Sequence, residues 1–176
     1  MDESTIRDRL AGLPIPVLRY FASTGSSNDE ALAWAEAGAP DGALVVADEQ
    51  TRGKGRLERR WITRPGAALA FSLVLRPGPD ELAHMPLYSP LGALAVSEAL
   101  AALDLPVQIK WPNDVLVAGR KVCGILAESA WQGGILQAVV LGIGVNVTPD
   151  SLPPAEQLNF PAACLEAELG RRLERV

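Results

Sequence analysis

Apolar and polar positions follow two rhythms along the first half of the chain, one typical of helices and one typical of strands. Residues 26–38 begin with polar capping residues, carry acids in the first turn and end at Gly38, which predicts a helix. Three short β-rich runs surround this segment, at residues 16–23, 42–50 and 67–77, and the last of them stops at a proline. The first half is therefore expected to place one helix among three strands.

Two further segments have apolar residues at helical spacing. In residues 84–103, Pro86 and Pro90 are expected to confine the regular helix to the part after residue 90. A proline-rich connection at 153–163 then leads to the segment 164–176. That segment predicts a final helix with one apolar face, made of Leu165, Leu169, Leu173 and Val176.

The second half also contains three β-type runs, at residues 107–112, 114–131 and 135–148. Glycine-containing segments at 118–121 and 131–134 suit hairpin turns. Strands joined by tight hairpins are antiparallel, which disfavours a doubly wound parallel sheet. We therefore expect an α+β fold with a largely antiparallel or mixed β-sheet and packed helices.

Length, composition and charge narrow the class of protein. The 176 residues are enough for one domain with a core, and 48% apolar and 21% charged residues are ordinary globular values. The net charge of −5 argues against broad nucleic-acid binding. No signal peptide or membrane span is indicated, and Cys123 and Cys164 fit reduced thiols. His84 is the single histidine and is expected to be structural, so a zinc site is disfavoured. Together these features predict a cytoplasmic protein of one domain.

Positive charge is concentrated in one glycine-containing segment, residues 50–64. Its basic residues outnumber the single acid Glu58 to give a local net charge of +5, and they are Arg52, Lys54, Arg56, Arg59, Arg60 and Arg64. The pattern of this segment indicates neither a helix nor a strand. It is not a phosphate-binding P-loop either, because that motif needs a Ser or Thr after the lysine and here Gly55 follows Lys54. The segment is thus either a solvated loop or a mobile lid for an anion. Trp61 at its exit is either a core residue or a platform for a purine.

Three further motifs have both a structural and a functional reading. In "KWPND" (110–114) the proline and the Asn-Asp pair suit a strand end with a turn. In "GRKVCGIL" (119–126), Lys121 either extends to water or places a fixed positive charge in a concave site. "LGIGVNV" (141–147) lacks the third glycine and the helix of a dinucleotide fingerprint. Its glycines, Gly142 and Gly144, instead allow a flat ligand to lie against the sheet.

The order of these motifs is more specific than any one of them. "SSN", "QTRGKGRLERRW", "KWPND", "GRKVCGIL" and "GIGVN", within residues 17–147, resemble the catalytic domain of biotin protein ligases. The resemblance implies the fold of the class II aminoacyl-tRNA synthetase and biotin synthetase group. This sequence departs from the family pattern at two positions: Lys54 stands where the family has an arginine, and Glu58 stands where it has a glycine. The SH3-like C-terminal domain and the helix-turn-helix N-terminal domain of relatives are not expected in residues 1–176, which we read as the catalytic domain.

The resemblance also implies a reaction and a set of residues for it. Biotin would be joined to AMP from ATP, with Mg²⁺, and then passed to a lysine of a biotin carboxyl carrier domain. The implied catalytic residues are Lys121, Arg56 and Asp114, while the metal ligands stay unassigned. The implied biotin-binding residues are Ser26, Ser27, Asn28, Gln50, Gly53, Lys54, Arg56, Lys121, Gly124, Gly142 and Gly144. The implied ATP-binding residues are Arg56, Arg59, Trp61, Asn113, Lys121 and Asn146.

Two other functions are kept beside this one. A lipoate or octanoate transferase has the same fold but a ligand without a ureido ring, which leaves the polar set Ser26, Ser27 and Gln50 without a purpose. A truncated, non-catalytic biotin-binding module is the second alternative. Neither a DNA partner nor a membrane partner is expected, and a homodimer is left open.

Overall fold

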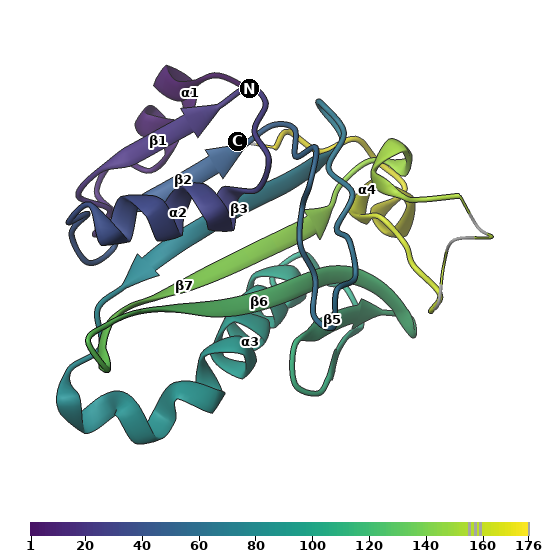
Figure 1. The fold of residues 1–176 in the computed structure, drawn as a ribbon. Coiled ribbons are helices and arrows are strands. Elements are labelled where there is room, and N and C mark those ends of the chain that lie inside the picture. Colours follow the sequence, from purple (N-terminus) through teal and green to yellow (C-terminus); the bar gives the residue numbers. More distant parts are fainter. Residues whose placement is uncertain (155, 157, 159, 176) are drawn as a thin grey trace.

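One seven-stranded sheet forms the centre of the part of the chain that the structure describes (Figure 1). The structure is a computed structural model and describes residues 1–154, 156, 158 and 160–175. The strand order is β1-β2-β3-β7-β6-β5-β4. The bounds are β1 Leu18–Phe21, β2 Leu44–Ala47, β3 Ala68–Leu75, β4 Val107–Lys110, β5 Asp114–Val117, β6 Arg120–Gln132 and β7 Ile135–Asn146.

The strand directions confirm a largely antiparallel, mixed sheet. Only the pair β1–β2 is parallel among the strand pairs of the described residues. The two predicted hairpin turns are present, at Ala118-Gly119 with φ of 47° and 75° and at Gly133-Gly134 with φ of 58° and 79°. Positive φ at both central residues is the geometry that matches the twist of the flanking strands. These turns explain why β5, β6 and β7 are neighbours in the sheet.

The structure confirms the helix predicted within residues 26–38 and corrects the bounds of the helices predicted within 84–103 and 164–176. The helix bounds are α1 Glu3–Arg9, α2 Ser27–Glu36, α3 Tyr88–Ala101 and α4 Leu165–Leu169, with 3₁₀ turns at Pro79–Leu87 and Pro149–Ser151. Helix α2 begins after its N-cap Ser26 and ends just before Gly38, whose φ is 90°, as predicted. Helix α1 was not indicated by the sequence pattern.

The two corrections concern where helices begin and end. Helix α3 includes Pro90 in its first turn, where the missing N–H of a proline would have no helical partner anyway. Helix α4 ends at Leu169 because Gly170 adopts φ of 64°, so Leu173 lies beyond the helix although it packs against the same core cluster as Leu165. Val176 of the predicted face lies outside the described residues, as do positions 155, 157 and 159 of the predicted connection.

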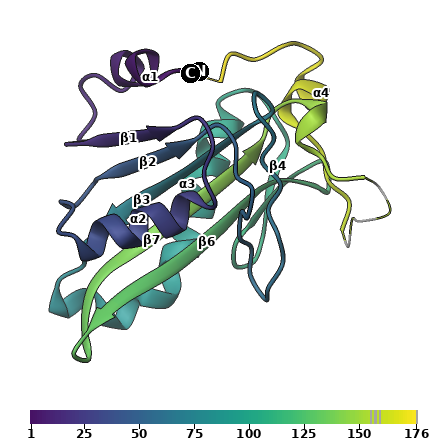
Figure 2. The same cartoon turned by 45° about the horizontal axis from the view of Figure 1, so that its top comes forward.

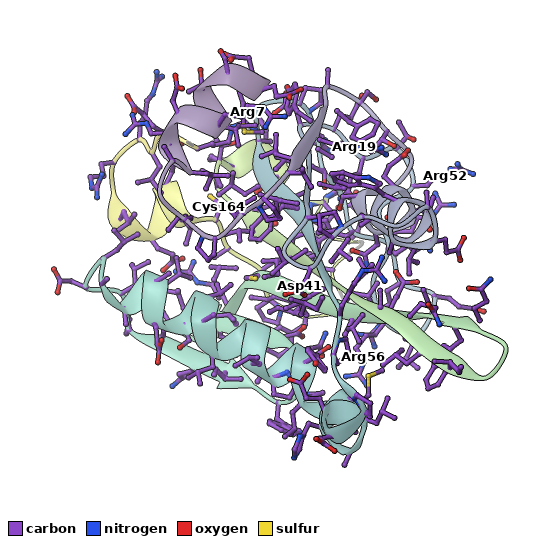
Figure 3. All side chains as sticks on the ribbon, turned by 90° about the vertical axis from the view of Figure 1, so that its left-hand side faces the viewer. Arg7, Arg19, Asp41, Arg52, Arg56 and Cys164 are labelled. Carbon is purple, nitrogen blue, oxygen red and sulfur yellow. The ribbon has the colours of Figure 1, made fainter. Side chains whose placement is uncertain are left out.

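Helices α2 and α3 cover opposite faces of the sheet (Figure 3). The side-chain alternation of strand β7 explains this arrangement, because successive residues point to opposite faces. Ala138 and Val140 pack in the cluster that contains the α2 residue Ala31. Leu141 packs instead in the cluster that contains Ala93 of α3. The face that carries α2 is also the face on which the functional site lies.

The two ends of the described chain lie close together (Figure 2). The guanidinium of Arg175 is 2.6 Å from a carboxylate oxygen of Asp48, and Arg9 lies 3.3 Å from Glu174. Both cysteines are free and buried, and burial raises the pKa of the Cys123 thiol, which keeps it protonated. Among the described helices, none combines the length and the apolar character needed to cross a bilayer.

We expect the substitution Arg76→Met to destabilise this architecture strongly. The Arg76 side chain donates hydrogen bonds of 2.8 Å to the carbonyls of Ala35, Ala39 and Gln137, which joins the end of α2 to strand β7. The three carbonyls would lose a charged donor, although that of Ala35 also accepts from the backbone N–H of Gly38 at 3.1 Å. We therefore expect a loss of roughly 2–4 kcal/mol in the free energy of unfolding. Urea unfolding measures it, with exposed Arg171→Met as the control. Equal stability of the two variants would contradict the prediction.

Candidate active site

The cationic segment forms an arm across the front of strands β6 and β7 (Figures 1 and 2). Its two sides pair through isolated bridges, one between Gln50 and Thr63 and one between Lys54 and Arg60. The arm turns at Leu57 and Glu58, both with positive φ (55° and 61°). The sequence predicted a loop without strand character, and the structure adds this local pairing. It comes from backbone hydrogen bonds, which do not require an apolar alternation.

A cavity of about 270 Å³ lies between the arm, the start of α2 and the sheet. It brings together most of the predicted site residues from five separate stretches of the chain. The predicted residues that line it are Ser26, Ser27, Asn28, Gln50, Lys54, Arg56, Arg59, Trp61, Asn113, Asp114, Lys121, Gly124, Gly142 and Gly144. Residues separated by more than 100 positions thus meet at one place on the sheet.

Two predicted residues, Gly53 and Asn146, do not line this cavity. Both border an adjacent cavity of about 520 Å³, which shares Gln50, Trp61 and Lys121 with the first. Asn146 is buried, and its side-chain amide donates a hydrogen bond of 3.1 Å to the carbonyl of Ala163. The structure therefore places these two residues beside the main cavity, in a cavity that the Trp61 indole also lines.

The glycines of the floor make room for side chains of the protein itself. A Cβ at Gly142 would overlap the carboxamide of Asn28, and a Cβ at Gly144 would lie 2.8 Å from Cζ2 of Trp61. Gly124 is similar, since its Cβ would lie 3.0 Å from the same ring. A flat ligand on Gly142 and Gly144 therefore stays a prediction, since in this structure Asn28 lies over Gly142 and the Trp61 indole lies over Gly144.

Neutral hydrogen bonds organise the inner end of the cavity. The Gln50 side-chain carbonyl accepts from the Ser27 backbone N–H at 2.7 Å and lies 3.0 Å from the Ser27 hydroxyl. The Gln50 amide nitrogen donates to the hydroxyl of Thr63 at 2.9 Å. Ser26 and Ser27 are both buried. A set of polar but uncharged groups in a buried position suits a neutral ligand with its own donors and acceptors.

The outer end of the cavity is cationic. Lys121 lies 2.7 Å from a carboxylate oxygen of Asp114, the one acid among the described residues that line the cavity. Arg56 donates to the side-chain carbonyl of Asn113 at 3.0 Å. The Lys121 ammonium is also 5.7 Å from the Trp61 ring centroid. Asp114 is outnumbered by the basic residues that line the cavity, so an anionic group of a ligand is favoured here. These basic residues are Lys54, Arg56, Arg59, Arg60, Lys110 and Lys121. Within the described residues, no cluster of three or more His, Cys, Asp or Glu side chains is placed to hold a metal ion.

Not every cation of the arm points to the cavity. Arg52 is exposed at the margin of the molecule in Figure 3, and Arg64 donates to the backbone carbonyl of Asp150 at 3.1 Å. Neither residue lines the cavity. The local charge of +5 is therefore divided between the site and the outer surface.

Lys54 is neutralised by acids that the sequence did not single out. Its ammonium forms a short ion pair with Asp29 at the start of α2 and lies 3.3 Å from Glu128 of β6. The hydrogen bond with Asp29, ahead of the charge of Glu128, raises the pKa of Lys54. Lys54 therefore ties one side of the arm to the body of the protein.

We expect Asp29→Asn to loosen this side of the arm. An exposed ion pair contributes up to about 1 kcal/mol, so tryptic cleavage after Lys54 should rise by up to about 5-fold. Mass spectrometry of a timed digest measures the rate at that bond. Asp80→Asn is the charge-matched control, because Asp80 is exposed on the distant turn Pro79–Leu87. Unchanged cleavage in Asp29→Asn would show that the ion pair does not hold the arm.

Trp61 separates the two cavities and carries an unpaired polar atom. Its indole lies on the glycine floor, lines both cavities, and has a buried Nε1 without a hydrogen-bond partner among the described residues. A buried N–H without a partner is costly. The indole is thus better suited to a state in which its N–H meets a ligand or solvent.

Four residues that hold predicted site residues by hydrogen bonds or ion pairs were not found from the sequence: Thr63, Ser72, Asp29 and Glu128. Each belongs to an otherwise ordinary helix, strand or turn pattern. Ser72 alone carried a signal, because it interrupts the buried positions of strand β3 with a hydroxyl. A buried polar residue in a strand needs a partner, and that requirement points to a site.

The chain is similar to known ligases over most of its length. Residues 20–146 match the model of the biotin/lipoate A/B protein ligase family. The chain is 37% identical over 161 residues to the bifunctional ligase/repressor BirA of Bacillus subtilis, covering 90% of this chain and 49% of that protein. It is 45% identical over 159 residues to the biotin–[acetyl-CoA-carboxylase] ligase of Paracoccus denitrificans, covering 88% of this chain and 65% of that protein.

A solved structure is similar in the same region. It is the biotin protein ligase from Aquifex aeolicus in complex with biotin and ATP, with a TM-score of 0.72 and 32% identity. The match covers 91% of this chain and 64% of that one. The chain thus spans between about half and two thirds of the length of these relatives.

Proposed function

The chain belongs to the biotin/lipoate A/B protein ligase family, and from that membership we propose that it is the catalytic domain of a biotin protein ligase. The proposed reaction has two steps. The carboxylate of biotin attacks the α-phosphorus of ATP, which gives biotinoyl-AMP and releases pyrophosphate. The amine of a carrier lysine then attacks the biotinoyl carbonyl and AMP leaves.

One observation carries this proposal beyond family membership: the cavity has a neutral, hydrogen-bonding inner end and a cationic outer end. The Ser27–Gln50 pair at the inner end suits the ureido ring of biotin. Lys121 and Arg56 at the outer end suit its carboxylate and the phosphates of ATP. The relatives named biotin ligases and the solved structure with biotin and ATP support the same assignment.

In the first step, two anions must approach each other, and the cations of the site counter their repulsion. Lys121 is a compact charge held by Asp114, which orients it toward the cavity. We assign Lys121 to the meeting point of the carboxylate and the α-phosphate, and Arg56 and Arg59 to the phosphates. Because these charges are already in place, little reorganisation accompanies the build-up of charge in the transition state.

Trp61 and Asn113 are assigned to the nucleotide. The Trp61 indole provides an aromatic surface for a purine, and its buried N–H has no hydrogen-bond partner among the described residues. Asn113 is held by a hydrogen bond of 2.9 Å from its amide to the carbonyl of Ile125, which leaves its carbonyl facing Arg56. Asn146, in the adjacent cavity with Gly53, is assigned to the border of the nucleotide site.

Mg²⁺ is proposed as the companion of ATP. Magnesium bound with a nucleotide takes most of its ligands from phosphates and water and needs only one or two protein carboxylates. Asp114, the one acid lining the cavity, fits that requirement. When bound, the ion would neutralise phosphate charge beside the basic residues that line the cavity.

The partner that receives biotin is proposed to be a biotin carboxyl carrier domain of a biotin-dependent carboxylase. The name of the Paracoccus relative supports this choice. A cytoplasmic location is supported by two free, buried cysteines. The net charge of −5 supports a domain that does not bind DNA. A homodimer stays a hypothesis.

Binding and turnover assays with the purified chain test the proposal. Biotin should raise the melting temperature and lipoate should not, because lipoate lacks the ureido ring that the polar inner end would bind. Pyrophosphate should be released only when biotin and ATP are both present. Stabilisation by lipoate instead of biotin would favour the lipoate or octanoate transferase. Biotin binding without pyrophosphate release would favour a non-catalytic binding module.

A further inference from the structure

Ser72 has a buried hydroxyl on the same face of the sheet as the glycine floor, beside Gly142. It lies on strand β3, has no exposed surface and does not line the cavity. Its neighbour on strand β7 is Gly142. Because Gly142 has no Cβ, the Asn28 carboxamide lies over this glycine and reaches the Ser72 hydroxyl.

The surroundings of Asn28 fix the direction of its hydrogen bond with Ser72. The Asn28 amide nitrogen faces two acceptors, a Glu128 carboxylate oxygen at 2.7 Å and the Leu126 carbonyl at 3.4 Å. The Asn28 carbonyl oxygen therefore faces Ser72, at 2.6 Å. A carbonyl oxygen only accepts, so the Ser72 hydroxyl must donate its single proton to Asn28.

This direction decides the role of the next hydroxyl, that of Ser27. The oxygens of Ser27 and Ser72 are 2.8 Å apart, and since the Ser72 proton is already used, Ser72 can only accept from Ser27. The other neighbour of the Ser27 hydroxyl, the Gln50 carbonyl oxygen at 3.0 Å, is also an acceptor. The Ser27 proton therefore points away from the cavity, and only its lone pairs face the cavity.

We propose that Ser72 is a positioning residue that fixes Ser27 as a hydrogen-bond acceptor and thereby selects ligands that present an N–H group. The inference rests on the proposed function, since the ureido ring of biotin carries such N–H groups. A dithiolane ring has none and would leave the buried acceptor unpaired. A site that keeps an unpaired buried polar group rejects the ligand that fails to satisfy it.

Biotin binding and adenylation by Ser72→Ala test this role. Removing the hydroxyl leaves the buried carbonyl of Asn28 without its donor and frees both side chains to reorient. The dissociation constant of biotin should rise roughly 10- to 100-fold, the effect of an unpaired buried acceptor. The rate of pyrophosphate release at saturating biotin should change less than about 3-fold, because the Ser72 hydroxyl contacts Ser27 and Asn28 and not the cations of the outer end. Unchanged biotin affinity would overturn the proposal.

Ser89→Ala is the matched control. The Ser89 hydroxyl accepts a hydrogen bond of 3.3 Å from the backbone N–H of Ala127, and it lies on helix α3, behind the opposite face of the sheet. Its loss should leave biotin affinity unchanged. Ser72→Cys keeps a weak donor of similar size and should give an intermediate affinity, which keeps the test open if Ser72→Ala does not fold.

A second ligand separates positioning from simple structural support. Biotin methylated on a ureido nitrogen cannot donate to Ser27, so the unmodified protein should bind it much more weakly than biotin. In Ser72→Ala the ratio of the two affinities should shrink several-fold, because Ser27 is no longer held as an acceptor. A lower melting temperature with an unchanged ratio would overturn the proposal in favour of a structural role. Failure of the unmodified protein to bind biotin would instead overturn the proposed function.

Discussion

Replacement of Lys121 by methionine is expected to reduce biotinoyl-AMP formation by on the order of 100-fold or more, the effect of removing a preorganised charge from a transition state. The ammonium stands at the cationic end of the cavity, 2.7 Å from Asp114. Charge builds up there on the pentacoordinate phosphorus and on the departing pyrophosphate. Biotin affinity should fall much less, because neutral groups at the inner end hold the ring. Calorimetry with biotin and pyrophosphate release on the same protein measure both quantities.

The control for this result must separate chemistry from stability, because Lys121→Met also removes the nearer of the two lysines that pair with the partly buried Asp114 and leaves only Lys110, at 3.9 Å. The variant Arg120→Met is that control. Arg120 is the preceding residue of strand β6, so its side chain points to the opposite face, where it pairs with the buried Glu168 at 2.7 Å. Both variants lose a cation beside a carboxylate, yet only Lys121→Met should lose turnover per folded molecule. Preserved turnover in Lys121→Met would mean that this lysine serves stability alone.

The substitution Gly144→Ala is expected to reduce adenylate formation by roughly 100-fold through displacement of Trp61. The added Cβ would lie 2.8 Å from Cζ2 of the indole and closer still to other ring atoms, so the ring must leave the glycine floor. A misplacement of about 1 Å in a site can cost on the order of 100-fold in rate. Pyrophosphate release measures the loss. Gly78→Ala is the control, since its Cβ would meet only Glu81 Oε2 at an ordinary 3.7 Å.

The stability of a double variant identifies the cause of the Gly144 effect. If the new methyl group clashes with the indole, Trp61→Phe should recover part of the unfolding free energy that Gly144→Ala loses. Residues in contact show such non-additive effects, whereas independent ones do not. Strictly additive losses in the double variant would show that Gly144 matters for another reason, such as backbone flexibility.

Local patterns in the sequence determined much of the fold. The helix Ser27–Glu36 was predicted because its cap, its first-turn acids and its terminal glycine act within a few residues of one another. The hairpins at Gly119 and Gly133-Gly134 were predicted because a tight turn needs residues that tolerate positive φ. The error at Pro90 arose because a proline is excluded from the interior of a helix but not from its first turn.

The order of the motifs also determined most of the candidate site, but only the tertiary structure decided how its members act on one another. Packing brings Asn28 over Gly142, seats Trp61 on Gly144, and neutralises Lys54 with two acids. Each of these contacts joins segments that are far apart in the chain. A sequence shows which residue types are present, whereas the free energy of a buried hydroxyl or an ion pair depends on the partner that the fold places beside it.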